Sequence, residues 1–528
     1  MRELSYPGRS NVLAQNGMAA TSNPLSSLEA INILRKGGNA VDAAIAASAV
    51  QAVVCPSATG IGGDCFAIIA LNGKEPIAVN GSGKAPRKAD LEYFSQRNIN
   101  KIDLTSPHSV TIPGAVHAWC TMHEKYGKLD LEEVLKKAED YARNGFPVHE
   151  VEAYAWKEKE IKLKNNENSK ELFLKNNKSY KFGDVFKNIP LADTIKLIGK
   201  DKIRGFYNSE VTKDMLETLN SLGGLHTEED FNSHKTIFSS TISNMYKKFK
   251  IHQCPFNGPG IIVLMMMAIN EKMNIDHFES TSFERYHLQA EITKVCYEFK
   301  ETTLGDPNFN KIDIDQILSD SFIENLISKI NIDKVYNSKK TYVTSNPETI
   351  YLTVVDRDLN AVSFINSICH VFGSGITTAN SGILFQNRGV NFRLEKYHPN
   401  CIQGGKRPLH TIIPGLLTNA NNETILSYGV MGGQYQPIGQ SHVLQNIIDY
   451  KQSIQEAIDL PRAFALNGDL KVEKSLDYNV MKKLKNIGHK IFVVPDAIGG
   501  GQCIEIDRDR GILIGGSDPR KDGMAMGY

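Results

Sequence analysis

Hydrophobic residues recur at helical spacing near the start of the chain and then at strand spacing, which predicts alternating helices and strands over residues 23–82. A helix is predicted to begin at Pro24, because Asn23 can cap it, and to end at the Gly37–Gly38 pair. Residues 40–54 are rich in alanine, and such small side chains favour a helix that lies close to its neighbours. Two apolar runs are predicted strands, at 60–71 and 76–82.

The apolar pattern changes along the rest of the chain from helical to strand spacing. Residues 261–269 are continuously apolar and follow Pro259, which predicts a buried helix. The lysine- and asparagine-rich stretch 157–188 predicts a solvated excursion or a loose helical arm. Further helical patterns cover 190–222 and 281–300, with a weaker one at 314–340. Strand patterns follow at 350–356, 360–368, 382–385, 490–495, 502–507 and 511–518.

Composition limits which folds and which binding partners are expected. A chain of 528 residues is longer than a single core usually supports, but no repeat or low-complexity linker divides it, so one layered body of helices and sheets is expected. The 60 basic and 59 acidic residues leave a net charge of +1, which argues against nucleic acid and anionic membranes as partners. We expect small-molecule partners, and a homodimer is left open.

Cellular location is also addressed by the sequence. The longest apolar run is far shorter than the ~20 residues of a membrane helix, and the N-terminus lacks the apolar stretch of a secretory signal. The eight cysteines have no paired spacing, so they are expected to be reduced and mostly in the core. These features together predict a cytoplasmic protein.

The motif PETIYLTVVD places Thr349 at the start of a predicted strand. A threonine there is most simply a good strand former, and the motif alone favours that interpretation. A second interpretation is that the chain cuts its own Glu348–Thr349 bond, by attack of the Thr349 hydroxyl on the Glu348 carbonyl. The cut would give the threonine a base of its own, an α-amine with an ordinary pKa of about 7.7–8.0.

Other catalytic motifs are weaker. The chain has no HExxH, GxSxG or Walker pattern, its fourteen histidines lack metal-ligand spacing, and neither a metal nor an organic cofactor is expected. His370, His410 and His442 are interpreted as hydrogen-bonding or core histidines. Most glycine pairs are interpreted as turns, but the one in GVMGGQYQP, at 429–437, follows a predicted strand and is the best candidate for an oxyanion hole of backbone amides.

Motifs along nearly the whole chain resemble the γ-glutamyltransferase (glutathione hydrolase) family of self-processing N-terminal-nucleophile hydrolases. Each motif is modest evidence, and the resemblance rests on their number and order. They include NPLSSLEAINILRKGGNAVDAAIAASAVQAVVCPSATGIGGDCF, TIPGAVHAW, GGLHTEEDF, TLGDPNF, TIYLTVVDRDLNAVSFINSI, FGSGI, SGILFQN, KRPLHTIIPGLL, GVMGGQYQP and GGSDPRKDGMAMGY.

This resemblance implies a site and a fold. Thr349 matches the family's nucleophile, and Glu348–Thr349 becomes the processing bond, with a large fragment of residues 1–348 and a small catalytic one of 349–528. Ser367 matches a second threonine whose hydroxyl supports the nucleophile, and Gly432 and Gly433 match the pair whose amides hold the oxyanion. The implied fold is a four-layer αββα sandwich, and the two fragments are expected to stay associated.

The residues that would bind the substrate depart from the family pattern. Ser82 stands about where an arginine binds the α-carboxylate of a glutamyl substrate, and Arg388 and Asn391 replace the residues that meet its amino group. His410–Thr411 replaces a serine pair, and Cys369 replaces an asparagine near the nucleophile. Because Arg388 favours an anion over a cation, weak turnover of glutathione is expected.

A short segment between NRGVN and KRPL also implies that a lid is missing, which favours hydrolysis over transfer. The leading hypothesis is an amidohydrolase that forms an acyl-enzyme with a γ-glutamyl-type amide and passes the acyl group to water or an amine. One alternative is an acylase or amidohydrolase for a non-glutamyl acyl amide. Another is an uncleaved, inactive relative that acts as a binding protein.

Overall fold

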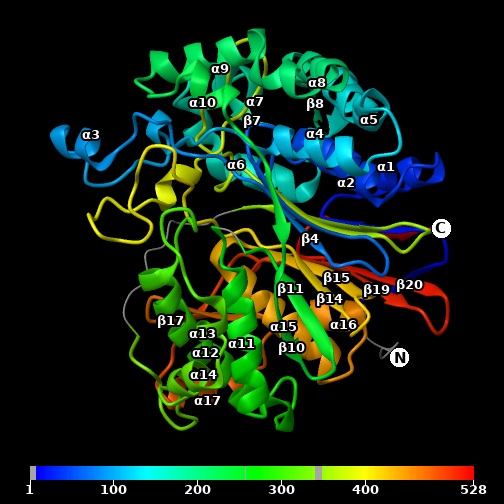
Figure 1. The fold of residues 1–528 in the computed structure, drawn as a ribbon, viewed down its shortest axis with the longest axis vertical. Helices are drawn as coiled ribbons and strands as arrows, with labels where there is room; N and C mark the ends of the chain where they lie inside the picture. The colour runs from blue at the N-terminus through cyan, green and yellow to red at the C-terminus, as the bar shows by residue number, and fades with distance from the viewer. Residues whose placement is uncertain (1–7, 256, 339–347) are drawn as a thin grey trace.

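The computed structural model describes residues 8–255, 257–338 and 348–528. Two large antiparallel sheets lie face to face, and helices cover the outer face of each, giving four layers (Figure 1). The predicted αββα sandwich is confirmed. The first sheet has the order β21 (Met524–Gly527), β2 (Met18–Thr21), β12 (Ile350–Val355), β13 (Ala361–Ser367), β3 (Asp64–Ala70), β4 (Ile77–Gly81) and β9 (Ile237–Ser240).

The second sheet packs against β12, β13 and β2 of the first. Its order is β1 (Val12–Ala14), β20 (Ile512–Ser517), β19 (Gly500–Asp507), β15 (Thr424–Met431), β14 (Gly415–Thr418), β11 (Phe249–Gln253) and β10 (Ile242–Tyr246). Both sheets combine strands that precede and follow residue 349. The two parts of the chain therefore share both large sheets.

Helices of the first outer layer confirm the N-terminal predictions. α1 (Pro24–Arg35) begins where Asn23 accepts a hydrogen bond from the backbone N–H of Leu25. α2 (Ala40–Val54) is buried along its whole length and packs on β12 and β13. The layer also contains α4 (Ala115–Tyr126), α5 (Leu131–Asn144), α8 (Ile189–Tyr207) and α9 (Glu210–Ser221).

Helices of the opposite layer cover the second sheet. α11 (Gly260–Lys272) is the predicted apolar helix, and Pro259 caps it rather than lying inside it. α12 (Phe283–Thr303) packs against α11, and α15 (Gln436–Ile448) and α16 (Ile454–Asp459) follow in the chain. Within the described residues no helix combines the length and apolar character needed to cross a bilayer. The eight cysteines are free thiols, and seven of them are buried, as predicted.

Two predicted elements need correction. Residues 382–385 do not form a strand: Gly382 has a φ of +66°, and the segment contributes only isolated bridges, Thr377 to Leu384 and Gly62 to Phe385. The helix predicted over 314–340 is limited to α13 (Ile314–Ile317) and α14 (Asp320–Ile327), and its last two positions lie outside the described residues. The strand predicted at 490–495 is confirmed as β18 (Lys490–Val493), which lies in a separate sheet with β16 (Ala463–Leu466) and β17 (Asp469–Val472).

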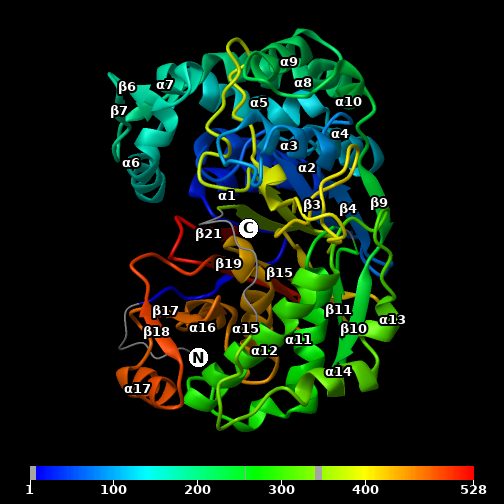
Figure 2. The same cartoon turned by 90° about the vertical axis from the view of Figure 1, so that its left-hand side faces the viewer.

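The stretch 157–188 is an ordered arm. It contains most of α6 (Glu150–Lys164), α7 (Glu167–Phe173) and the short strands β6 (Leu174–Lys175), β7 (Lys178–Ser179) and β8 (Val185–Phe186), and Figure 2 shows α6, α7, β6 and β7 grouped at one side of the first helical layer. The polar composition of this stretch gave no sign of an aromatic cluster. In the structure, Trp156 packs against Phe173, Phe186 and Phe372.

Candidate active site

Thr349 lies immediately before β12, one of the central strands of the first sheet, and is 1% exposed. Its hydroxyl donates a hydrogen bond to the Glu348 carbonyl oxygen at 2.6 Å. The same hydroxyl lies 3.1 Å from the Ser367 hydroxyl. The uncut chain therefore holds the threonine oxygen beside the carbonyl that self-cleavage would require it to attack.

Ser367 ends β13, the antiparallel neighbour of β12. Its hydroxyl donates to the Glu348 carbonyl oxygen at 3.2 Å and accepts from the backbone N–H of Cys369 at 2.9 Å. Because Ile350 pairs with Asn366 in the ladder, Ser367 lies across from Thr349. Ser367 is thus placed to orient the Thr349 hydroxyl and to polarise the carbonyl.

Cys369 holds the other side of the Glu348 peptide. Its carbonyl accepts the Glu348 N–H at 2.9 Å, and its own φ is +79°, in the region that favours glycine. Burial alone would raise the pKa of the thiol, but the positive charge of Arg388 and the interactions with His370, including a hydrogen bond, outweigh burial and lower it. This short turn after β13 therefore fixes the backbone next to the Glu348–Thr349 bond.

Gly432 and Gly433 follow β15 directly and begin the turn into α15. Their φ values are +116° and +57°, and a Cβ at Gly432 would lie 2.7 Å from the Gly499 Cα. The preceding strand lies on the start of β12, since a Cβ at Gly429 would come within 2.3 Å of the Tyr351 ring. The glycine pair thus lies at the end of β15, which packs on β12, the strand that directly follows Thr349.

A buried charged cluster lies across β13 from Thr349. Asp64 pairs with Ser367 in the β3–β13 ladder, and its Oδ2 lies 3.6 Å from Arg388 Nε and 3.9 Å from His410 Nε2. The Thr411 hydroxyl accepts from Arg388 Nη1 at 3.3 Å. Within this cluster, five buried atoms have no hydrogen-bond partner among the described residues: Asp64 Oδ2, Arg388 Nε and Nη2, and both ring nitrogens of His410.

Burial and neighbouring charges set the protonation states in this cluster. Burial raises the pKa of Asp64 to about 6, although the charge of Arg388 and the Gly83 N–H oppose the shift. Burial lowers the pKa of His410 well below its usual range, and the positive charges of Arg388 and Arg407 lower it further. The imidazole is therefore neutral, and the charge of Arg388 faces the Asp64 carboxylate within the cluster.

Comparison with known proteins identifies the family. The family model described as gamma-glutamyltranspeptidase matches residues 26–528. The chain belongs to the gamma-glutamyltranspeptidase family. It is 33% identical to the glutathione hydrolase-like YwrD proenzyme of Bacillus subtilis, over 98% of this chain and 99% of the relative. It is 30% identical to the oxamate amidohydrolase proenzyme of Klebsiella pneumoniae, over 98% of this chain and 100% of the relative.

Solved structures agree with this assignment. The crystal structure of cephalosporin acylase from Bacillus halodurans superposes with a TM-score of 0.93 at 33% identity, covering 100% of this chain and 99% of that one. The resemblance inferred from sequence motifs is therefore confirmed, together with the fold. The roles of individual site residues remain predictions.

Two of the predicted substrate-binding residues contact mainly the scaffold in this gamma-glutamyltranspeptidase family member. The Ser82 hydroxyl donates to Asn80 Oδ1 at 2.6 Å, and its carbonyl accepts from Arg407 Nε at 3.1 Å. Asn391 donates to the Leu409 carbonyl at 3.1 Å and so supports the loop that carries His410. By contrast, Arg388, His410 and Thr411 lie together in the cluster around Asp64, and their role in binding substrate stays a prediction.

Sequence reasoning missed Asp64 and Lys521. Asp64 was contained in the quoted motif GIGGDCF, but its neighbours became clear only when β3 was paired with β13. Lys521, in the motif KDGMAMGY, contacts Glu348 from the far end of the chain. The sequence feature that could have pointed to both residues is a charged side chain within an otherwise apolar or glycine-rich motif.

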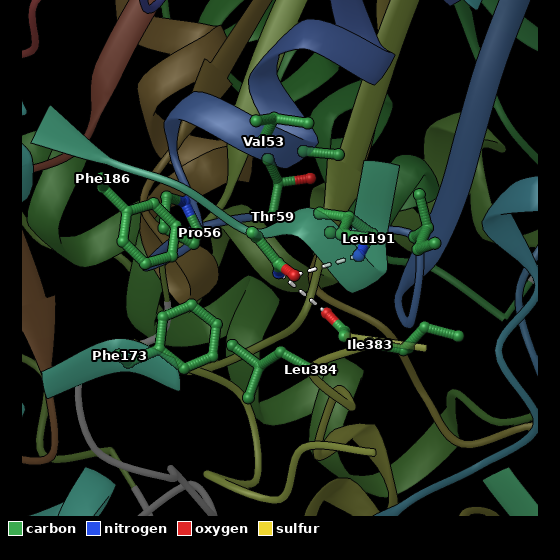
Figure 3. Close-up of a pocket in the computed structure, with 13 residues that line it drawn as sticks. Val53, Pro56, Thr59, Phe173, Phe186, Leu191, Ile383 and Leu384 are labelled. Carbon is green, nitrogen blue, oxygen red and sulfur yellow. Dashed lines mark hydrogen bonds between the residues drawn. The ribbon is translucent and has the colours of Figure 1, made fainter. Parts of the chain in front are cut away.

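Two further features lie outside the Thr349 site. His287, Glu291 and His489 have metal-ligand atoms close together, but Lys294 already contacts Glu291 at 2.5 Å and the two imidazoles hydrogen-bond at 2.8 Å, so the cluster is satisfied by protein groups. A pocket beneath the arm is lined by apolar side chains, including Val53, Phe173, Phe186 and Leu384 (Figure 3). Neither Thr349 nor Arg388 lines it.

Proposed function

We propose that this chain is a self-processing amidohydrolase whose nucleophile is Thr349. The Thr349 oxygen attacks the Glu348 carbonyl carbon, the C–N bond breaks, and the amide nitrogen takes up the hydroxyl proton. Water then hydrolyses the ester, which releases the Glu348 carboxylate and leaves Thr349 with a free hydroxyl and a free α-amine. The products are the fragments 1–348 and 349–528.

The single observation that carries this proposal is the position of the Thr349 hydroxyl, 2.6 Å from the Glu348 carbonyl oxygen and 3.1 Å from Ser367. The names of the relatives add support, because both curated relatives described above are proenzymes. The fragments would remain associated, since each large sheet contains strands from both.

Turnover would use the same residues. The α-amine of Thr349 accepts the hydroxyl proton as the oxygen attacks the amide carbonyl of the substrate. Backbone N–H groups of Gly432 and Gly433 stabilise the negative oxygen of the tetrahedral intermediate. The amine leaving group takes the proton, and water or a second amine then accepts the acyl group from Thr349.

The acyl donor we propose is an amide with a carboxylate in its acyl part. The γ-glutamyl amides are one such class, in line with the family. The non-glutamyl acylase alternative is supported by the similarity to cephalosporin acylase and by the changed residues around Arg388. Nε and Nη2 of Arg388 form one edge of the guanidinium and make no hydrogen bond to the described residues, although Nε faces Asp64 Oδ2 at 3.6 Å. This edge suits a carboxylate held through two hydrogen bonds.

Self-cleavage is tested on a denaturing gel. The wild-type protein is expected to give two bands, of which the smaller begins at Thr349 by N-terminal sequencing. The Thr349→Ala variant is expected to remain one band and to hydrolyse no amide. A wild-type protein that stays in one piece, binding ligands without turning them over, would favour the inactive relative instead.

The acyl donor is tested with three p-nitroanilides: γ-glutamyl, glutaryl and the neutral pentanoyl derivative. The Arg388→Ala variant is expected to raise KM at least about tenfold for the two carboxylate donors and much less for pentanoyl. Arg393→Ala is the control, because Arg393 lies on the same segment but pairs with Glu301 and Glu395. Equal effects of Arg388→Ala on all three donors would remove Arg388 from the pocket.

A further inference from the structure

The side chain of Glu348 is bound by a lysine near the C-terminal end of the chain. Lys521 Nζ lies 3.0 Å from Oε1 and 3.1 Å from Oε2 of Glu348, so one ammonium is shared by both carboxylate oxygens. The Lys521 side chain is 14% exposed and that of Glu348 is 30% exposed. Burial would lower the pKa of Lys521, but Glu348 outweighs burial and raises it, so the lysine is a cation in the uncut chain.

Lys521 is presented by a well-anchored loop. The loop joins β20 in one large sheet to β21 in the other. Its first residue, Asp518, accepts hydrogen bonds from Arg462 at 2.5 Å and from the Gly501 N–H at 2.8 Å. Gly500 makes room for the lysine, since a Cβ there would lie 2.8 Å from Lys521 Cγ. The ammonium therefore has a fixed place relative to both sheets.

Glu348 is consequently held at three points. Its N–H is bound by the Cys369 carbonyl, its carbonyl oxygen by the hydroxyls of Thr349 and Ser367, and its carboxylate by Lys521. Ser367 and Cys369, which make part of the first two contacts, belong to β13 and the turn after it. Without the third, rotation of Glu348 would be limited only by its own backbone contacts.

We propose that Lys521 is a positioning residue for self-cleavage, and that its ion pair with Glu348 fixes the Glu348 carbonyl for attack by Thr349. This inference rests on the proposed self-processing and goes further by assigning the identity of residue 348 a role in it. A glutamate before the threonine would then be required for its charge as well as its length.

The test measures how fast freshly synthesised precursor disappears in a cell-free translation reaction, so that early cleavage is visible. Misplacement of a reacting group by about 1 Å can cost about a hundredfold in rate. Lys521→Met is therefore expected to slow cleavage by about tenfold to a hundredfold, and Lys521→Arg to slow it far less. Glu348→Gln should fall between them, because the amide oxygen still accepts a hydrogen bond.

Charge exchange provides the decisive variant. The double variant Glu348→Lys with Lys521→Glu is expected to cleave faster than Lys521→Met, because the ion pair is restored in reverse. Lys490→Met is the matched control and should cleave at the wild-type rate, because it breaks an exposed ion pair with Asp469. Thermal melting of each variant, in a Thr349→Ala background that cannot cleave, separates positioning from general stability.

Four results would overturn the inference: wild-type cleavage rates in Lys521→Met, no recovery by charge exchange, loss of thermal stability that parallels the loss of rate, or slowing in the control. Failure of the proposed function looks different, because the wild-type precursor itself would then stay uncut. In that case the variants have no cleavage rates to compare, and this inference fails together with the proposed function.

Discussion

At the scale of single residues, the candidate site depends on backbone geometry as much as on reactive groups. Thr349 and Ser367 were nominated through the family resemblance, because the motif around Thr349 alone favours an ordinary strand residue. The role of Cys369 could not be predicted in this way, since its contribution is a carbonyl oxygen and a left-handed φ rather than its thiol. Asp64 and Lys521 were also out of reach, because strand pairing and a loop between sheets bring them to the site.

Cys369 provides a prediction at this scale. With φ at +79°, a residue carrying a Cβ is strained, and a β-branched residue more so. Cys369→Gly is expected to be at least as stable as Cys369→Ala, although glycine normally costs about 0.5–1 kcal/mol relative to alanine. Cys369→Val should lose about 1–3 kcal/mol and cleave slowly, because the strained turn shifts the carbonyl that binds Glu348.

Urea unfolding in the Thr349→Ala background measures the stabilities, and gel assays of the otherwise wild-type chain measure cleavage. Alanine serves as the control because it removes the thiol while keeping a Cβ. A glycine variant clearly less stable than the alanine variant would show that the left-handed backbone is not the constraint.

At the scale of elements, local chemistry predicted many single helices and strands, but not the order of the strands in the sheets. The cap at Asn23 and the alanine-rich run that became α2 are properties of neighbouring residues, so the sequence contains them directly. Strand order depends on pairing between distant segments. Residues 382–385 show the limit: four apolar residues match a strand, but Gly382 at positive φ turns them into a loop.

Helix α2 provides the prediction at this scale. Ala46 is fully buried, and α2 packs between α1, α4 and α5 and against β12 and β13. Ala46→Leu is expected to cost about 1–3 kcal/mol of stability, because a closely packed helix has no room for three more carbons. Ala153→Leu, on the half-buried face of α6, should cost less than about 1 kcal/mol. Urea unfolding compares the two, and equal losses would contradict close packing around α2.

At the scale of the whole molecule, the arm is tied to the body by a buried carboxyl group. Glu152 of α6 accepts hydrogen bonds from the Ser57 hydroxyl at 2.8 Å and from the Ser57 N–H at 3.3 Å. Burial raises its pKa from 4.5 to about 8, the Ser57 hydrogen bonds oppose the shift, and the charges of Asp522 and Glu348 add to it. The folded protein therefore keeps a proton on Glu152 that the unfolded chain releases at lower pH.

This difference predicts how stability changes with pH. Above pH 4.5 the unfolded chain releases the Glu152 proton while the folded chain keeps it up to about pH 8, so the contribution of Glu152 to stability falls as pH rises through that window. The Glu152→Gln variant has no carboxyl group at this position, so its stability lacks this pH-dependent contribution. Relative to wild type, the variant should gain a few kcal/mol of stability between about pH 5 and about pH 8.

The comparison belongs in the Thr349→Ala background, where Glu348 stays in place, with urea unfolding at each pH. Glu139→Gln is the control, because Glu139 is bound by the surface cations Lys136 and Arg143. Parallel curves for wild type and Glu152→Gln would show that Glu152 is ionised in the folded protein.

The last residue of the chain lies against the beginning of the fold. The Tyr528 carbonyl accepts the backbone N–H groups of Gln15 and Asn16, and its own N–H binds the Gly17 carbonyl. A flexible linker from Tyr528 to the segment before β1 would close the polypeptide into a ring without disturbing either sheet. Opening that ring at residue 349 gives a circular permutant whose first encoded residue after the initiator methionine is Thr349. Removal of the methionine would then expose the α-amine directly, and hydrolysis of substrates could be studied apart from the maturation that normally precedes it.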